Sequence, residues 1–134
     1  MVNSRIVEIR STIRNKAPSL PFARVARAIL GPTYELSLVL CGDALAQKMN
    51  RTYRKKDYPA NVLSFSYGKR EGEIFLNVRK AAREARRLGI PTKSRIAHLF
   101  IHGCLHLAGL PHGKKMDFLE QKILNQLDLV RSKH

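Results

Sequence analysis

Four of the chain's five histidines lie within one short stretch, HLFIHGCLHLAGLPHG, at residues 98–113. His102 and His106 are four residues apart, so in a helix their imidazoles follow one another on one face, one turn apart. Two histidines at this spacing direct ring nitrogens to a common point, as in helical zinc sites. The stretch therefore predicts metal chemistry, which requires at least one further ligand from outside the pair.

The third ligand is predicted from a glycine and the histidine that follows it. Gly109 comes seven residues after His102, and glycine takes the positive φ that ends a helix and reverses the chain. A bend there returns His112 toward the first two histidines. Three neutral imidazole nitrogens with an open fourth position are typical of a catalytic zinc site. We therefore expect His102, His106 and His112 to hold one Zn²⁺ per chain.

The spacing is that of the metzincin proteases, H-E-x-x-H-x-x-G-x-x-H, with one departure. Gly103 stands where the proteases have their general base, a glutamate. Bound zinc would still lower the pKa of a water toward about 7, but peptide hydrolysis by the protease route is not supported. His98 extends the histidine face by one turn. Three ligands on a straight helix would be spread over roughly 12 Å, too far for one ion, so we interpret His98 as a supporting or satisfied core histidine.

The helix that carries these histidines is apolar almost all round from Ile96 to Leu110, which predicts that it is buried in the middle of a domain. The elements around it follow from periodicity. Helical patterns cover residues 21–31, 44–54, 79–89 and 115–130, and strand-like alternation covers residues 34–41, 61–67 and 73–78, with a weaker edge strand over residues 4–10.

These elements predict one domain over residues 1–134 with an α+β fold. A small mixed β-sheet of three or four strands is packed with helices, and the central buried helix carries the metal motif. The GKREG segment joins two strands as a hairpin-like connection. The order of the strands in the sheet does not follow from the pattern.

The chain is strongly basic. Its 134 residues carry a formal net charge of +15, from 25 basic and 10 acidic residues. The excess is spread over the chain, with 11 basic and 4 acidic residues in 1–67 and 14 and 6 in 68–134. A field of this kind favours polyanions, nucleic acid first and an acidic membrane second. A solvated basic surface without a specific partner is the plainer interpretation.

Cysteine usage and the N-terminus predict a cytoplasmic protein. Cys41 and Cys104 are far apart and form no CxxC motif, so two buried, reduced thiols are expected. The N-terminal residues contain no apolar core of a signal peptide, although a mildly basic transit peptide is an alternative. No apolar run approaches transmembrane length, and no membrane partner is expected.

Four motifs, in order, resemble the YbeY family of endoribonucleases, which mature and quality-control ribosomal RNA. HGCLHLAGLPH resembles the family's H-G-x-L-H-L-x-G-x-x-H signature, and NRTYRKKDYPANVLSFS matches its N-x-x-Y-R-x-x-D-x-P-T-[DN]-V-L-S-F-P segment. GEIFLN is similar to its G-D-I-x-I strand and MDFLEQKIL to its M-x-x-L-E-x-x-I-L helix. Pro111, Ser66 and Ala60 depart from the usual Asp, Pro and Thr, and none of these changes removes a ligand.

The resemblance implies a zinc-dependent, single-strand-specific endoribonuclease that acts in ribosomal RNA maturation, at the 3′ end of 16S-type RNA, and in ribosome quality control. It places a catalytic arginine at Arg54, where a fixed guanidinium can stabilise the charge that develops on phosphate oxygens. The plainer interpretation of Arg54 is a solvated helix end. The expected partners are single-stranded RNA, ribosomal RNA with the small ribosomal subunit, and ribosome-associated proteins.

Basic residues beside the two central motifs are expected to hold the RNA backbone, with salt-sensitive contacts that carry little sequence information. These residues are Arg51, Lys55, Lys56, Arg79, Arg83, Arg86 and Arg87. Two alternatives remain at this level. One is a ribosome-binding assembly factor with a structural zinc and little intrinsic nuclease activity, and the other is a zinc hydrolase with a different substrate.

Overall fold

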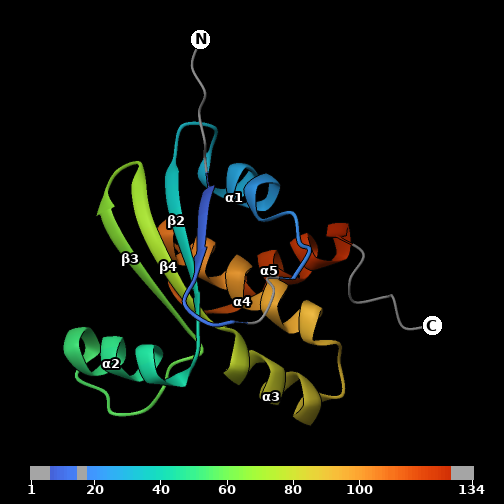
Figure 1. Ribbon diagram of the computed structural model, residues 1–134. Helices are drawn as coiled ribbons and strands as arrows, with labels where there is room; N and C mark the ends of the chain where they lie inside the picture. Colours follow the sequence, from blue (N-terminus) through green and yellow to red (C-terminus); the bar gives the residue numbers. More distant parts are fainter. Residues whose placement is uncertain (1–6, 15–17, 128–134) are drawn as a thin grey trace.

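The structure is a computed structural model that describes residues 7–14 and 18–127. Within these residues the chain forms one four-stranded mixed sheet covered by helices (Figure 1). In spatial order the strands are β1 (Val7–Ser11), β2 (Glu35–Cys41), β4 (Glu71–Asn77) and β3 (Val62–Gly68). Neighbours are parallel except β3 and β4, which are antiparallel. The predicted α+β class with a small mixed sheet is confirmed.

Five helices follow from the periodic segments. They are α1 (Phe22–Leu30), α2 (Asp43–Arg54), α3 (Val78–Leu88), α4 (Thr92–Leu107) and α5 (Lys114–Leu127). The predicted edge strand is β1, although residues 4–6 of that prediction lie outside the described part of the chain, as does Val130 of the predicted last helix. No described helix has the length and apolar character needed to cross a membrane.

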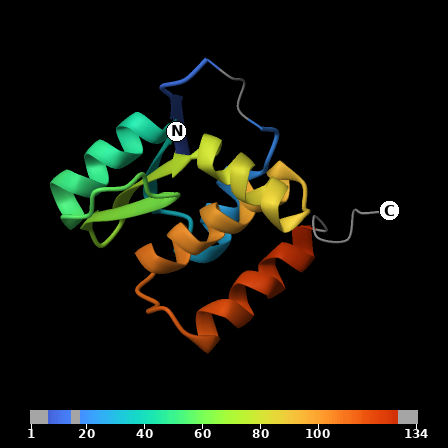
Figure 2. The ribbon, with the colours of Figure 1, turned by 90° about the horizontal axis from the view of Figure 1, so that it is seen from below.

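Two apolar layers explain the burial of the central strands. Side chains on one face of the sheet, such as Leu38 and Ile74, pack against α4 together with α1 and α5. On the other face Val39 and Phe75 pack against α2, whose Ala46 is buried there. Figure 2 shows α2 on one side of the sheet and α4 and α5 on the opposite side. The sheet therefore holds the end of α2 and the histidine helix at a fixed separation.

Helix α4 is the buried centre of the fold, as its all-round apolar pattern predicts. Phe100, Ile101 and Cys104 are at most 1% exposed. Cys104 and Cys41 are both buried and unpaired with each other, in agreement with two reduced thiols. Helix α4 ends at Leu107, three residues earlier than the apolar pattern suggests, because the chain has already begun to turn before Gly109.

Candidate metal centre

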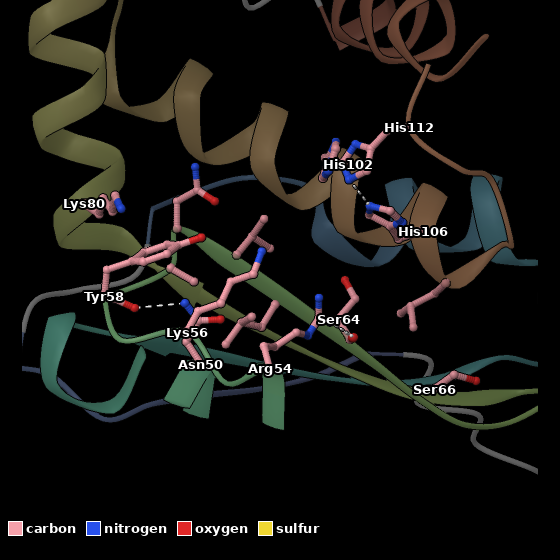
Figure 3. Close-up of a pocket in the computed structure, with 15 residues that line it drawn as sticks. Asn50, Arg54, Lys56, Tyr58, Ser64, Ser66, Lys80, His102, His106 and His112 are labelled. Carbon is pink, nitrogen blue, oxygen red and sulfur yellow. Dashed lines mark hydrogen bonds between the residues drawn. The ribbon is translucent and has the colours of Figure 1, made fainter. Parts of the chain in front are cut away.

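The bend at Gly109 brings three histidines together. Gly109 has φ +97°, and its N–H donates to the carbonyl of His106 at 2.9 Å, which closes the last turn of α4. The chain then returns along α4 so that His112 faces His106, with 3.0 Å between their Nε2 atoms. One nitrogen from each of His102, His106 and His112 lies within 4.8 Å of the others. The predicted clustering is therefore present (Figure 3).

The donor set fits a divalent transition metal. At Zn–N distances of about 2.0–2.1 Å, tetrahedral ligands place their nitrogens about 3.3 Å apart. His106 Nε2 and His112 Nε2 are 3.0 Å apart, and all three ligand nitrogens lie within 4.8 Å of one another. Burial, with the nearby His102 and His112, lowers the pKa of His106, so this ring is neutral near pH 7 and able to ligate. His112 is exposed, which leaves one side of the cluster open to solvent.

A glutamate that sequence reasoning missed supports the cluster from behind. Glu120 on α5 is 5% exposed, and its two carboxylate oxygens contact His98 Nε2 at 2.7 Å and His102 Nδ1 at 2.5 Å. Burial alone would raise the pKa of Glu120, but the two histidine hydrogen bonds outweigh it and lower that pKa. His98 is thus a supporting residue outside the cluster, as its position in α4 predicts.

The signal for Glu120 was present in the sequence. The face of α5 that packs most deeply runs through Met116, Glu120 and Leu124 at intervals of four, so a glutamate stands in the middle of an apolar stripe. The apolar pattern of the sequence predicts a stripe through Met116, Leu119, Ile123, Leu127 and Val130. Of these Met116 is buried as predicted, Leu119, Ile123 and Leu127 are only partly buried, and Val130 lies outside the described residues. A charge within a buried stripe requires a partner, and here the partners are histidines.

We expect Glu120→Gln to weaken metal binding by about 10–100-fold, since a carboxylate that orients a ligating histidine contributes this much to affinity. Glutamine keeps the shape but replaces one acceptor by an N–H₂ group, which cannot accept from a histidine N–H. The affinity for Zn²⁺ is measured by competition with a chelator. Asp117→Asn, the same chemical change at an exposed position of α5, is the matched control. An unchanged affinity in Glu120→Gln would remove the supporting role.

A hollow of about 480 Å³ joins the histidines to the end of α2. Arg54 lines it together with all three clustered histidines, although α2 and α4 lie on opposite faces of the sheet. The Arg54 Nη2 donates to the carbonyl of Ser64 at 3.0 Å, and its guanidinium lies 5.5 Å from the centre of the Phe65 ring. Arg54 is exposed, and the edge strand β3 therefore holds it at the rim of the hollow (Figure 3).

The structure separates the other predicted RNA contacts into groups. Lys56 lines the hollow with Arg54, while Arg51 pairs with Asp57 at 2.8 Å. Arg83 binds Asp43, and this hydrogen bond, followed by one from Asn77, lowers the pKa of Asp43. Of the remaining predicted residues, Lys55 and Arg87 are exposed. The other three, Arg79, Arg83 and Arg86, line a second hollow beside α3.

Lys80 and Asn61 also line the histidine hollow. Lys80 belongs to the basic helix expected to hold RNA, whereas Asn61 was not singled out from the sequence. Lys80 Nζ donates to the carbonyl of Pro59 at 2.6 Å and lies 5.4 Å from the centre of the Tyr58 ring. Figure 3 shows Lys80 and Tyr58 at the end of the hollow away from the histidines. The two cations Lys56 and Lys80 thus make this end basic as well.

The chain is similar to known proteins in sequence and in fold. The profile of the family described as Endoribonuclease YbeY matches residues 7–128. The Endoribonuclease YbeY of Aromatoleum aromaticum is 40% identical over 112 residues, which span 78% of this chain and 73% of that protein. That of Geobacter sulfurreducens is 35% identical over 125 residues, or 78% and 83% of the two chains. The solution structure of TM1509 from Thermotoga maritima has a similar fold, with a TM-score of 0.63 at 20% identity over 90% of this chain and 88% of that one.

Proposed function

The chain belongs to the YbeY family of metal-dependent endoribonucleases, and on this premise we propose that it cleaves single-stranded RNA in the maturation and quality control of ribosomal RNA. The proposed substrate is the 3′ region of 16S-type RNA within the small ribosomal subunit, and the proposed compartment is the cytoplasm. One observation carries the proposal: the three clustered histidines and Arg54, from opposite faces of the sheet, line the same hollow.

The clustered residues divide into a metal-holding group and a phosphate-binding group. His102, His106 and His112 would hold the ion, which we propose to be Zn²⁺. When bound, such an ion supplies Lewis-acid polarisation of a phosphate oxygen and lowers the pKa of water. Arg54 presents a guanidinium fork to the same space, and paired N–H bonds to phosphate oxygens are strongest where negative charge develops. Its bond to Ser64 fixes the orientation before substrate arrives.

Basic residues along the hollow would hold the RNA strand on either side of the reacting phosphate. Lys56 and Lys80 lie in the hollow itself, and Tyr58, half exposed, offers a ring against which an unpaired base can stack. The predicted contacts outside the hollow, from Arg51 and Lys55 to the arginines of α3, would extend the path. Contacts to phosphates make binding fall steeply with salt.

The alternative of a structural zinc in an assembly factor is disfavoured by the openness of the cluster. Structural zinc sites are closed by four protein ligands, whereas the described residues near this cluster supply three, and His112 is exposed beside a hollow. Among the described residues, this is the group of histidine, cysteine and acidic side chains placed to hold an ion.

The test is cleavage of a single-stranded RNA by the purified chain and by Arg54→Ala. We expect the variant to lose about 10²–10³-fold in kcat, as when one preorganised charge-stabilising donor is removed, with its metal content unchanged. Arg54→Lys keeps the charge but not the fork and should recover only part of the loss. Arg24→Ala, an exposed arginine on α1, is the control. Equal activity in all four proteins would show a contaminating nuclease and reject the proposal.

A further inference from the structure

A continuous row of polar groups runs behind the histidine cluster and joins α3, α4 and α5. It begins at Glu84 of α3, which is 7% exposed and receives a hydrogen bond from Arg95 Nε at 2.8 Å. The same guanidinium reaches His98 Nδ1 through Nη1 at 3.4 Å. His98 Nε2 then meets Glu120 at 2.7 Å, and the second oxygen of Glu120 meets His102 Nδ1.

The chemistry of the row determines where its protons lie. A guanidinium can only donate, so His98 Nδ1 must be the acceptor, and the proton of a neutral His98 ring is on Nε2. An ionised carboxylate can only accept, so Glu120 receives hydrogen bonds from His98 Nε2–H and from His102 Nδ1–H. The proton of His102 is thus on Nδ1. Its Nε2 is left with a lone pair, and this is the nitrogen of His102 able to face the other clustered histidines.

Hydrogen bonds to neighbouring side chains hold the row of polar groups in place. Arg95 is held by Glu84, and Glu84 is in turn held by Asn61 Nδ2, 3.2 Å away at the wall of the histidine hollow. With Arg95 fixed, His98 cannot turn its ring over without placing a protonated nitrogen against a cation. With His98 fixed, the Glu120 carboxylate accepts one hydrogen bond from His98 and one from His102, and these two bonds together fix its orientation. Because these groups are largely buried, the loss of one donor leaves its partner unsatisfied.

We propose that Arg95 and His98 are positioning residues that, through Glu120, set the tautomer and the orientation of His102 so that its Nε2 is ready to bind a metal. The inference rests on the metal-holding role proposed above for the clustered histidines. It assigns a function to two residues of α4 that belong neither to the lining of the hollow nor to the histidine cluster. It also explains why a largely apolar helix carries Arg95 two turns and His98 one turn before its first clustered histidine, His102.

The first measurement is the tautomer of each histidine in the metal-free protein, from long-range ¹H–¹⁵N correlation spectra at a pH where the rings are neutral. We expect His98 with its proton on Nε2 and His102 with its proton on Nδ1. This readout needs neither metal nor activity. The opposite tautomer of His102 in the unaltered chain would overturn the inference, whatever the variants do. The expected tautomers in a chain that binds no metal would instead reject the proposed function alone.

The second measurement is the Zn²⁺ dissociation constant of matched variants, by chelator competition. Arg95→Met and His98→Leu remove a donor and should weaken binding by about 10–100-fold, with mixed tautomers at His102. His98→Gln keeps an N–H for Glu120 and should bind as the unaltered chain does. Arg24→Met on α1 controls for loss of an arginine. Unchanged tautomers and affinity in Arg95→Met and His98→Leu would overturn the inference, and if either variant fails to fold, the spectra of the unaltered chain and of His98→Gln decide.

Discussion

His106→Ala is expected to lose bound metal and RNA cleavage together. His106 is the middle member of the cluster, with its ring centre 4.8 Å from that of His102 and 4.4 Å from that of His112. Its removal leaves two imidazoles and no replacement donor among the described residues at that position. Since a catalytic ion contributes several kcal/mol of charge stabilisation, we expect cleavage to fall by at least about 10³-fold. Elemental analysis and single-stranded RNA cleavage measure the two losses.

Metal removal from the unaltered chain is the internal control for this variant. A chelator should abolish cleavage, and added Zn²⁺ should restore it, whereas the same addition should leave His106→Ala inactive. Because His106 packs at the end of α4 and not in the apolar centre, the variant should remain folded by circular dichroism. Full cleavage by metal-free His106→Ala would reject the metal-dependent mechanism.

The site was predictable from the sequence to the extent that it is local. His102 and His106 share a face because of helical periodicity, and the return of His112 follows from one glycine, so the eleven residues 102–112 contain the whole arrangement. The sheet was predictable for a similar reason, since alternation marks each strand. The order of the strands depends on contacts between segments far apart, and no periodic pattern records it.

The supporting contacts could not be predicted in the same way. Glu120 lies 18 residues beyond His102, on another helix, and the contact appears only after α5 packs on α4. The salt bridges of Arg83 and Arg51 also join residues whose pairing the sequence does not show, with the result that two arginines expected at the RNA are already bound to carboxylates. Composition shows how much basic charge is present, but the fold decides which part of it faces the hollow.

Gly103→Glu, which restores the glutamate of the protease pattern, is expected to unfold the chain. A Cβ at Gly103 would lie 3.0 Å from both Ile74 Cδ1 and Ser64 Oγ, because α4 lies against β4 and β3 at this residue. The Ser64 hydroxyl also donates a hydrogen bond to the Gly103 carbonyl at 3.1 Å, so a hydrogen bond as well as packing holds α4 close to β3 here. A larger side chain must therefore displace Ile74 and Ser64 from their present positions, and a glutamate also brings a carboxylate against the fully buried Ile74.

The size of the effect separates packing from charge. Gly103→Ala gains about 0.5–1 kcal/mol of helix propensity and loses about 1–3 kcal/mol to overpacking, so we expect a modest loss of stability. For Gly103→Glu we expect a loss above about 4 kcal/mol, measured by chemical denaturation, or an insoluble product. Lys93→Glu, at an exposed position of the same helix, should change stability by no more than about 0.5 kcal/mol. A stable Gly103→Glu protein would contradict the packing argument.

If the expectation holds, the fold itself requires a glycine at the position where the proteases have their general base. The residues that act on the phosphate must then come from the rim of the hollow, where Arg54 lies.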